Sequence, residues 1–356
     1  MDLRPTEEQQ QLRDTLRRLF DRRLADLVEA LPAPPRHDAA RDLADAVAVG
    51  LNGLGLPEAV GGAGTFADLT VAHEELGRGL AGPLLPAIAG AGRFLMRATG
   101  SRRDEFLSAI VEGRSTATIG WRDGTGGCRR VVCGPDVDTV CIVEDARVHV
   151  VPTNAADVEW REEATGCDIS SWTLRLPADV ADAETTLQID ARGRGRARNE
   201  IATLAAARQI GGARAVLDRT IEYVKTREQF DRAIGTFQAV QHQLADIAME
   251  IDAAQLAVWQ AAWSVDSADE SNECVRLGSI AALTAGSAFQ RATLVAHQLH
   301  GGMGFVLDSP LHLWSARAIA DPTFPSTRRE ILDDLAAASG LAPDAVAKKP
   351  DHRVTL

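Results

Sequence analysis

Aromatic side chains are scarce in this sequence of 356 residues. Phe, Trp and Tyr together make up 4% of the chain, and there is a single Tyr. The sequence also lacks a run of about 18 uncharged apolar residues, so no membrane-spanning helix is expected. Hydrophobic residues nevertheless account for 45% and charged residues for 25%, as in ordinary globular proteins. We therefore expect two or three domains whose large core is built from Ala, Leu, Val and Ile.

Cysteines are few and show no paired spacing. Their number, five, is odd, and no Cys-x-x-Cys occurs. We expect reduced thiols in a cytoplasmic protein rather than a disulfide framework or a zinc site. The polar N-terminal segment MDLRPTEEQQQLRD also lacks the apolar stretch of a signal peptide. The cysteines are Cys128, Cys133, Cys141, Cys167 and Cys274.

Positive charge is in deficit. The 38 Lys and Arg residues are outnumbered by 50 Asp and Glu residues, which gives a formal net charge of −12. Such a field repels phosphate backbones, so nucleic acid is not an expected partner.

Residues 1–114 are predicted to form a helical domain. Thr6 and Gln9 have the spacing of a capping box, which satisfies amide groups at a helix start. The proline-rich segment 31–37 ends the first helix, because proline lacks an amide donor and clashes with the preceding turn. The apolar stripe of this helix is Leu12, Leu16, Leu19, Leu24 and Leu27. Further helices are predicted over 39–52, 66–80 and 82–98.

The pattern changes after this domain. Residues 115–191 contain short runs rich in Val, Ile and Thr, such as STATIGW and DTVCIVE, separated by turn residues. Residues 192–340 return to a helical period, with Ala-rich segments joined by short turns. Residues 341–356 form a polar tail. The predicted fold class is α+β, with an N-terminal helical domain, a small middle β domain and a C-terminal helix bundle.

Three segments carry a family resemblance. They are YVKTREQFDRAIGTFQAVQHQLADIAMEIDAAQLAVW (223–259), HQLHGGMGFVLDSPLHLW (297–314) and LNGLGLPEAVGGAGTFADLTVAHEELGRGL (51–80). The sequences of these segments and their order along the chain resemble the acyl-CoA dehydrogenase family, and the resemblance covers most of the chain. The resemblance implies an N-terminal helical domain, a middle β domain and a C-terminal four-helix bundle that builds an oligomer core.

The resemblance also implies FAD, held partly by a neighbouring subunit. The positions that match the family's cofactor contacts are Arg227, Phe230, Gln238, Gln298, Gly301, Gly302 and Thr327. Arginine offers a planar fork of donors to a diphosphate, and adjacent glycines let backbone amides approach it closely. Taken singly, Arg227 is equally well an exposed cation at a helix end, and Gly301-Gly302 an ordinary helix C-terminus.

The family's usual catalytic glutamate is missing. Counted forward from Gly302, its position falls on Pro325, which cannot accept a proton. Some relatives place the glutamate on the helix leading into TREQF, and there the counted position is Ile201. Glu200 is one residue away, about 100° around a helix. Two interpretations stay open: Glu200 is a displaced base, or, as we favour, it is a first-turn acid stabilised by the helix dipole.

The activity implied by the resemblance is FAD-dependent α,β-dehydrogenation of an acyl thioester, by this chain alone or within a heteromeric enzyme. A carboxylate removes the α-proton while the β-hydrogen leaves as hydride. Two alternatives remain: a base-poor partner subunit that completes a sister chain's FAD site, or a flavin-dependent oxidase or oxygenase. Implied partners are an acyl thioester, homologous subunits in a dimer or tetramer, and an electron-acceptor flavoprotein. Short relatives with a GFVLDSPLHLW-like segment resemble the second subunit of heteromeric enzymes acting on bulky acyl chains such as steroid side chains.

One basic run, RGRGRAR at 192–198, stands out in the acidic chain. It is not a dinucleotide-binding fingerprint, because no strand of a parallel sheet precedes it. One interpretation is that it binds a negatively charged group: a phosphate of CoA or of a phosphopantetheine arm, or acidic residues of a carrier protein. The other interpretation is that it is a solvated linker. We favour the linker.

Overall fold

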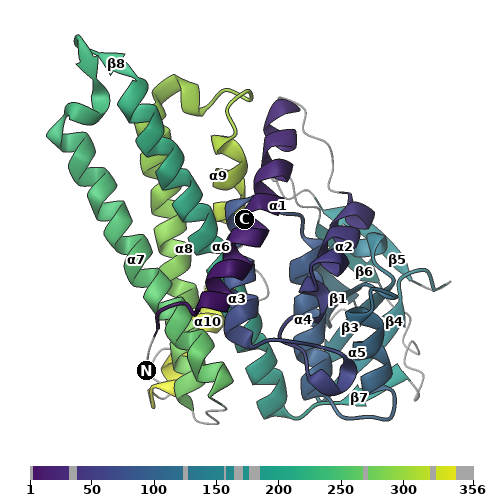
Figure 1. Ribbon diagram of the computed structural model, residues 1–356. Coiled ribbons are helices and arrows are strands. Elements are labelled where there is room, and N and C mark those ends of the chain that lie inside the picture. The colour runs from purple at the N-terminus through teal and green to yellow at the C-terminus, as the bar shows by residue number, and fades with distance from the viewer. Residues whose placement is uncertain are drawn as a thin grey trace, which may run out of the picture.

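The computed structural model describes residues 3–31, 38–122, 127–155, 158–163, 171–175, 185–267, 272–320 and 326–341. Figure 1 shows a mixed sheet on one side, a bundle of long helices on the other, and the N-terminal helices between them. The predicted α+β class and its order of helices, sheet and bundle are confirmed. No helix in the described ranges combines the length and apolar character that crossing a bilayer requires.

The N-terminal helices follow the expected segments closely. They are α1 (Glu7–Glu29), α2 (Ala39–Ala48), α3 (Phe66–Arg78), α4 (Leu84–Arg97) and α5 (Arg103–Val111). The capping box is confirmed: the Thr6 hydroxyl accepts from the Gln9 amide, and the Gln9 side chain accepts from the Thr6 amide. The helix predicted over 39–52 is shorter than expected, because Gly50 takes a left-handed backbone conformation and a short 3₁₀ turn follows.

The middle segment forms a seven-stranded sheet in the order β5-β6-β2-β1-β3-β4-β7. Its strands are β1 (Ala117–Arg122), β2 (Gly127–Val132), β3 (Thr139–Glu144), β4 (Arg147–Pro152), β5 (Glu159–Glu163), β6 (Ser171–Arg175) and β7 (Thr186–Gln188). Only the β1–β3 pair is parallel among the described pairs. β5 is a strand that the sequence did not predict, since its residues EWREE are mostly charged, as edge strands often are.

Three long helices dominate the C-terminal part of the described chain: α6 (Ala191–Thr226), α7 (Gln238–Asp266) and α8 (Asn272–His300). The shorter α9 (Leu311–Ala320) and α10 (Arg328–Ala338) pack against α8. Small side chains let the long helices approach closely, and the core contains many alanines, among them Ala206, Ala213, Ala254 and Ala285. The α6 helix runs from the sheet to the far end of the bundle (Figure 1).

A pair of glycines sets the distance between α3 and α6. A Cβ on Gly77 would lie 1.9 Å from the carbonyl oxygen of Arg208, and a Cβ on Gly211 would lie 1.8 Å from that of Glu74. Real Cβ atoms do not approach backbone oxygens so closely. The glycine of the EELG segment is therefore needed for contact between the N-terminal helices and the bundle.

The two acids of EELG are buried and paired. Glu74 accepts from Arg13 at 3.1 Å and from the indole nitrogen of Trp259 at 2.6 Å, which joins α1, α3 and α7. Glu75 accepts from Arg17 at 2.8 Å and from Arg78 at 2.6 Å. Buried carboxylates need such partners, so these residues position helices rather than carry out chemistry.

The basic run 192–198 is not a linker, and that prediction is wrong. It forms the first two turns of α6, which Asp190 caps by accepting from the Gly193 amide at 2.6 Å. Arg194 donates to the carbonyl oxygen of Asp145, and Arg198 lies 2.6 Å from Asp334 of α10. The run thus fixes the start of α6 to the sheet and to the C-terminal helices.

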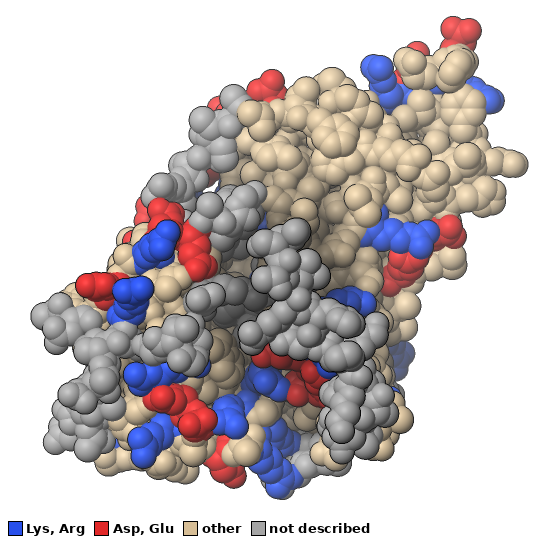
Figure 2. Space-filling view, turned by 180° about the vertical axis from the view of Figure 1, so that it is seen from behind, with Lys and Arg blue, Asp and Glu red and all other residues tan. Residues whose placement is uncertain are grey.

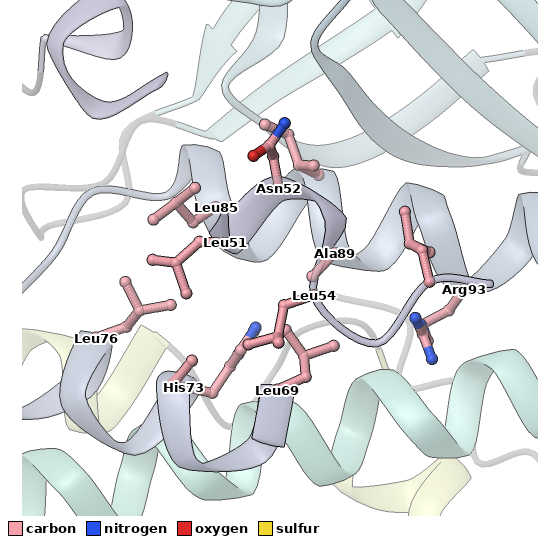
Figure 3. Close-up of a pocket in the computed structure, with 12 residues that line it drawn as sticks. Leu51, Asn52, Leu54, Leu69, His73, Leu76, Leu85, Ala89 and Arg93 are labelled. Atoms are coloured by element: carbon pink, nitrogen blue, oxygen red, sulfur yellow. The ribbon is translucent and has the colours of Figure 1, made fainter. Parts of the chain in front are cut away.

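A small cavity of about 20 Å³ lies in the N-terminal domain (Figure 3). Leucines of α3, α4 and the 51–56 segment line it, together with Asn52, His73 and Arg93. This volume holds about one water molecule, so the cavity is part of the core and not a substrate site.

His73 makes stability depend on pH. Burial, followed by the positive charge of Arg208, whose Nη1 lies 3.3 Å from His73 Nδ1, sets the pKa of His73 well below 6.5. The native chain keeps the ring neutral while the unfolded chain protonates it. The contribution of His73 is therefore complete above pH 6.5 and falls as pH drops below that value, by up to about 1.4 kcal/mol per pH unit. Chemical denaturation measures the free energy of unfolding at pH 7.5 and at pH 5.5. This free energy should fall less between the two pH values for His73→Gln than for wild type. Equal losses would contradict this assignment.

The four described cysteines, Cys128, Cys133, Cys141 and Cys274, are buried free thiols. Burial raises the pKa of Cys141 to about 12, so this thiol is unreactive at neutral pH. Cys167 lies outside the described residues. No cluster of three metal-binding side chains occurs in the described ranges.

Candidate functional site

The matched segments at the C-terminus of α6 and at the C-terminus of α8 meet at one end of the bundle. The Tyr223 ring of α6 stacks on the ring of His300 of α8, with centroids 4.1 Å apart. The Tyr223 hydroxyl also donates to the backbone oxygen of His300 at 3.3 Å. Burial lowers the pKa of His300, so its ring is neutral at pH 7 and suited to stacking. Sequence reasoning did not single out this pair, which joins the two halves of the candidate site.

A tight hairpin follows α6 at this end. Strands β8 (Glu228–Gln229) and β9 (Arg232–Ala233) are joined by Phe230 and Asp231, which have positive φ angles of 56° and 59°. Two successive positive φ angles define a type I′ turn, which favours Gly and Asn. A Phe at its first position is strained, and the residue is 86% exposed, with its ring edge-on to that of Phe237. Strained backbone of this kind is frequent at functional sites, and the role of Phe230 as a cofactor contact stays a prediction.

Arg227 lies directly between α6 and the hairpin. It is the C-terminal capping residue of α6, and its side chain is exposed. Gln238, the first residue of α7, is also exposed, and a short 3₁₀ turn over 234–236 packs between α6 and α7. The structure thus brings Arg227, Phe230 and Gln238 to one surface.

The glycine loop completes this surface. Gln298 is exposed near the end of α8, and Gly301 and Gly302 begin a 3₁₀ turn over Gly301–Gly304. A Cβ on Gly301 or on Gly302 would meet no heavy atom within 4 Å. Gly301 has a positive φ of 59°, which glycine adopts without strain, so its backbone conformation accounts for a glycine there. Gly302 has no such requirement, and both residues are exposed, so a ligand can approach their backbone closely.

We call this end of the bundle the rim, defined by Arg227, Phe230, Gln238, Gln298, Gly301 and Gly302. Figure 2 shows a broad surface with few charged side chains below the hairpin. Large exposed apolar side chains occur in and beside the rim segments, namely Phe230, Leu294, Met303, Phe305 and Leu307. An apolar patch of this kind is typical of an interface with another chain.

Thr327 lies far from the rim. It caps α10 in a box with Glu330, and Asp334 of the same helix pairs with Arg198 near the start of α6. At 1.5 Å per residue, Arg198 and Arg227 are about 40 Å apart along α6. Thr327 and Arg227 of one chain are therefore too far apart to contact one FAD molecule.

Glu200 is buried in an ion pair between domains. Arg97 of α4 donates to its carboxylate, and Arg93 Nη1 lies 3.9 Å from its Oε2. The interpretation as a first-turn acid is wrong, since α6 begins at Ala191 and Glu200 falls in its third turn. Oε2 makes no hydrogen bond within the described residues. Its role as catalytic base stays a prediction, as does the loss of the usual base at Pro325, which lies outside the described residues.

Two side chains of β1 are engaged in the core. Thr118 is fully buried and donates to the Val132 carbonyl at 2.8 Å. Trp121 packs edge-on against Phe94 of α4, with ring centroids 5.0 Å apart.

Comparisons with known proteins identify the family of the chain. Residues 6–114 match the model "Acyl-CoA dehydrogenase, N-terminal domain", and residues 198–324 match "Acyl-CoA dehydrogenase, C-terminal domain". The chain belongs to the acyl-CoA dehydrogenase family.

Several relatives match over most of their length. The acyl-CoA dehydrogenase IpdE2 of Mycolicibacterium smegmatis is 30% identical over 81% of this chain and 84% of that protein. IpdE2 of Mycobacterium tuberculosis is 28% identical over 92% of this chain and 96% of that protein. A variant of the Tcur3481-Tcur3483 steroid ACAD matches with a TM-score of 0.79 and 25% identity, over 94% of this chain and 98% of that chain.

Proposed function

We propose that this chain is a subunit of an FAD-dependent acyl thioester dehydrogenase whose cofactor site is shared between subunits. The observation that carries the proposal is the rim, where matched residues from the ends of α6 and α8 and from the start of α7 lie together and exposed. The long distance from the rim to Thr327 within one chain supports a cofactor site that is shared between subunits. The rim would bind the diphosphate and ADP end of one FAD molecule. The Thr327 region of the same chain would contact the flavin end of a second FAD molecule.

The residues of the rim suit this ligand. The Arg227 guanidinium would pair with the diphosphate, and the exposed backbone at Gly301 and Gly302, which has no side chain in the way, would let the cofactor approach closely. The Phe230 ring, held outward by the hairpin, would cover an aromatic or apolar part of the cofactor. FAD, when bound, supplies the hydride acceptor of the reaction.

A heteromeric assembly is part of the proposal. Pro325 occupies the usual base position, and the two guanidiniums of Arg93 and Arg97 lie at the Glu200 carboxylate. A sister chain with its own glutamate would then remove the α-proton. The likeness to the Tcur3481-Tcur3483 steroid ACAD supports a two-chain enzyme and a bulky acyl group such as a steroid side chain. An electron-transferring flavoprotein would reoxidise the cofactor.

The test is an absorbance spectrum, with native mass spectrometry, of the chain expressed alone and with a homologous sister chain. We expect yellow protein that bleaches anaerobically on addition of acyl-CoA when both chains are present. A chain that is yellow alone and reduced by acyl-CoA would be a complete homomeric dehydrogenase. Failure of both samples to bind FAD would overturn the proposal, and oxygen-coupled oxygenation of the substrate would favour the oxygenase alternative.

Phe230→Asn separates stability from cofactor binding. Asn tolerates the left-handed conformation at φ 56°, so the unliganded chain should gain up to about 1 kcal/mol. Loss of the exposed ring should weaken FAD binding at the same time. Thermal unfolding of the cofactor-free protein and an FAD titration measure the two effects. A Phe230→Asn variant that is less stable than wild type and binds FAD as tightly as wild type would contradict this role for the hairpin.

A further inference from the structure

A second pocket lies behind the rim, on the side of α6 that faces the N-terminal domain. Its volume is about 570 Å³, large enough for a small organic molecule. It lies between α1, the C-terminal half of α6 and the segment that joins α8 to α9 (Figure 1). None of the six residues that define the rim lines it, but the stacked Tyr223 and His300 form part of its wall, so it adjoins the proposed cofactor site.

One arginine in this pocket is held by an aromatic ring. The guanidinium of Arg219 stacks on the ring of Trp314, with its central carbon 4.9 Å from the ring centroid. That contact fixes the plane of the group but uses none of its N–H donors. No hydrogen bond or ion pair engages Arg219 within the described residues. Arg219 thus presents an oriented, unused donor set to the pocket.

The other charges of the pocket are largely compensated. Asp21 is bound by Arg78 at 2.7 Å, and Glu222 is bound by Lys225 at 2.6 Å. Asp218 is the remaining acid, one position before Arg219 on α6. A ligand with two or more negative charges would meet these carboxylates. A single negative charge placed on Arg219 would come near Asp21 alone, whose own charge is already paired with Arg78.

The rest of the lining comes from both sides of the pocket and is mostly apolar. Leu24, Ala215, Met303, Pro310 and Leu311 are apolar, and Tyr223, His300 and Ser309 add polar atoms. Burying apolar surface against these side chains would add affinity that is independent of charge. The pocket therefore combines one fixed cation with apolar walls.

We propose that this pocket binds an amphipathic monocarboxylate, with its carboxylate on Arg219 and its apolar body against Leu24, Met303 and Leu311. This inference does not depend on the proposed function, because it names a different site and a ligand that is not a thioester. A molecule bound here would touch both ends of the loop that carries Gly301 and Gly302, through Met303 and Pro310.

The test is isothermal titration calorimetry of the full chain with octanoate. Two control ligands are titrated in the same way: 1-octanol, which has the apolar chain without the charge, and inorganic phosphate, which has the charge without the apolar chain. We expect one octanoate per chain and at least 10-fold weaker binding for Arg219→Gln, because a charge-assisted bidentate contact is lost. Ser309→Trp, which fills the pocket while keeping the arginine, should also abolish binding. Arg276→Gln removes a partly exposed arginine of α8 that pairs with Glu273 away from the pocket, and should leave binding unchanged.

Three results would overturn the proposal. One is the absence of octanoate binding to a correctly folded wild type. The second is binding that survives both Arg219→Gln and Ser309→Trp, which would place the ligand in an acyl site elsewhere. The third is equal affinity for octanoate and 1-octanol, or binding of phosphate alone. None of these results bears on FAD binding at the rim, which the absorbance spectrum tests separately.

Discussion

Glu200→Gln is expected to lower the free energy of unfolding by about 3–5 kcal/mol, the usual cost of removing one partner of a buried ion pair. The substitution would leave Arg93, which is buried with 2% of its side chain exposed, without its nearest carboxylate. Arg97 would lose its charged acceptor in the same step. Urea denaturation at fixed protein concentration measures the change.

The matched control is Glu222→Gln on the same helix. Glu222 is exposed and pairs with Lys225, so its loss should change stability by no more than about 0.5 kcal/mol. Adding Arg93→Met to Glu200→Gln should recover part of the lost stability, since the buried arginine is then removed as well. A Glu200→Gln variant as stable as wild type would contradict a structural ion pair.

The same variant tests the predicted catalytic role. If the sister chain supplies the base, flavin bleaching by acyl-CoA should persist in the folded fraction of Glu200→Gln. Loss of bleaching in protein that still binds FAD would identify Glu200 as the displaced base instead.

Gly211→Ala is expected to destabilise the chain by at least about 3 kcal/mol, at the upper end of overpacking costs. The new Cβ would lie 1.8 Å from the Glu74 oxygen and 2.9 Å from the Arg78 amide nitrogen, both in the backbone of α3. A backbone cannot rotate away as a side chain can, so α3 and α6 must separate. Denaturation curves, with circular dichroism to confirm helix content, report the loss.

Gly195→Ala on the same helix is the control for this prediction. A Cβ on Gly195 meets nothing within 4 Å, and alanine favours helix over glycine by about 1 kcal/mol. The control should therefore be neutral or stabilising. Equal effects of the two substitutions would show that helix propensity, and not the close approach of α3 and α6, determines the result.

Local patterns predicted local structure well. The Thr6–Gln9 capping box and the strands of the sheet centre follow from spacing and residue type, and the structure contains them. The start of α6 was missed because Gly193 and Gly195 disfavour helix and arginines oppose the dipole at a helix N-terminus. Tertiary contacts outweigh both effects, since Ala197 is buried in the core beneath the sheet.

Contacts between distant segments could not be predicted in the same way. The partners of Glu200 lie about a hundred residues earlier, and no spacing rule connects Arg97 to it. The stacking of Tyr223 on His300 also depends on how α6 and α8 pack. The family resemblance listed Thr327 with the rim residues as contacts of an FAD held partly by a neighbouring subunit, and only the structure shows that Thr327 lies far from the rim of its own chain.

The most direct test of the shared cofactor site is the FAD dissociation constant of the assembled protein with Arg227→Ala, compared with Lys225→Ala. Both residues are exposed cations at the end of α6, and only Arg227 belongs to the rim. The account predicts FAD binding weakened by about 30-fold or more for Arg227→Ala, the loss expected when one partner of a charge pair is removed, and little change for Lys225→Ala. Arg227→Ala protein that retains FAD as tightly as wild type would contradict it.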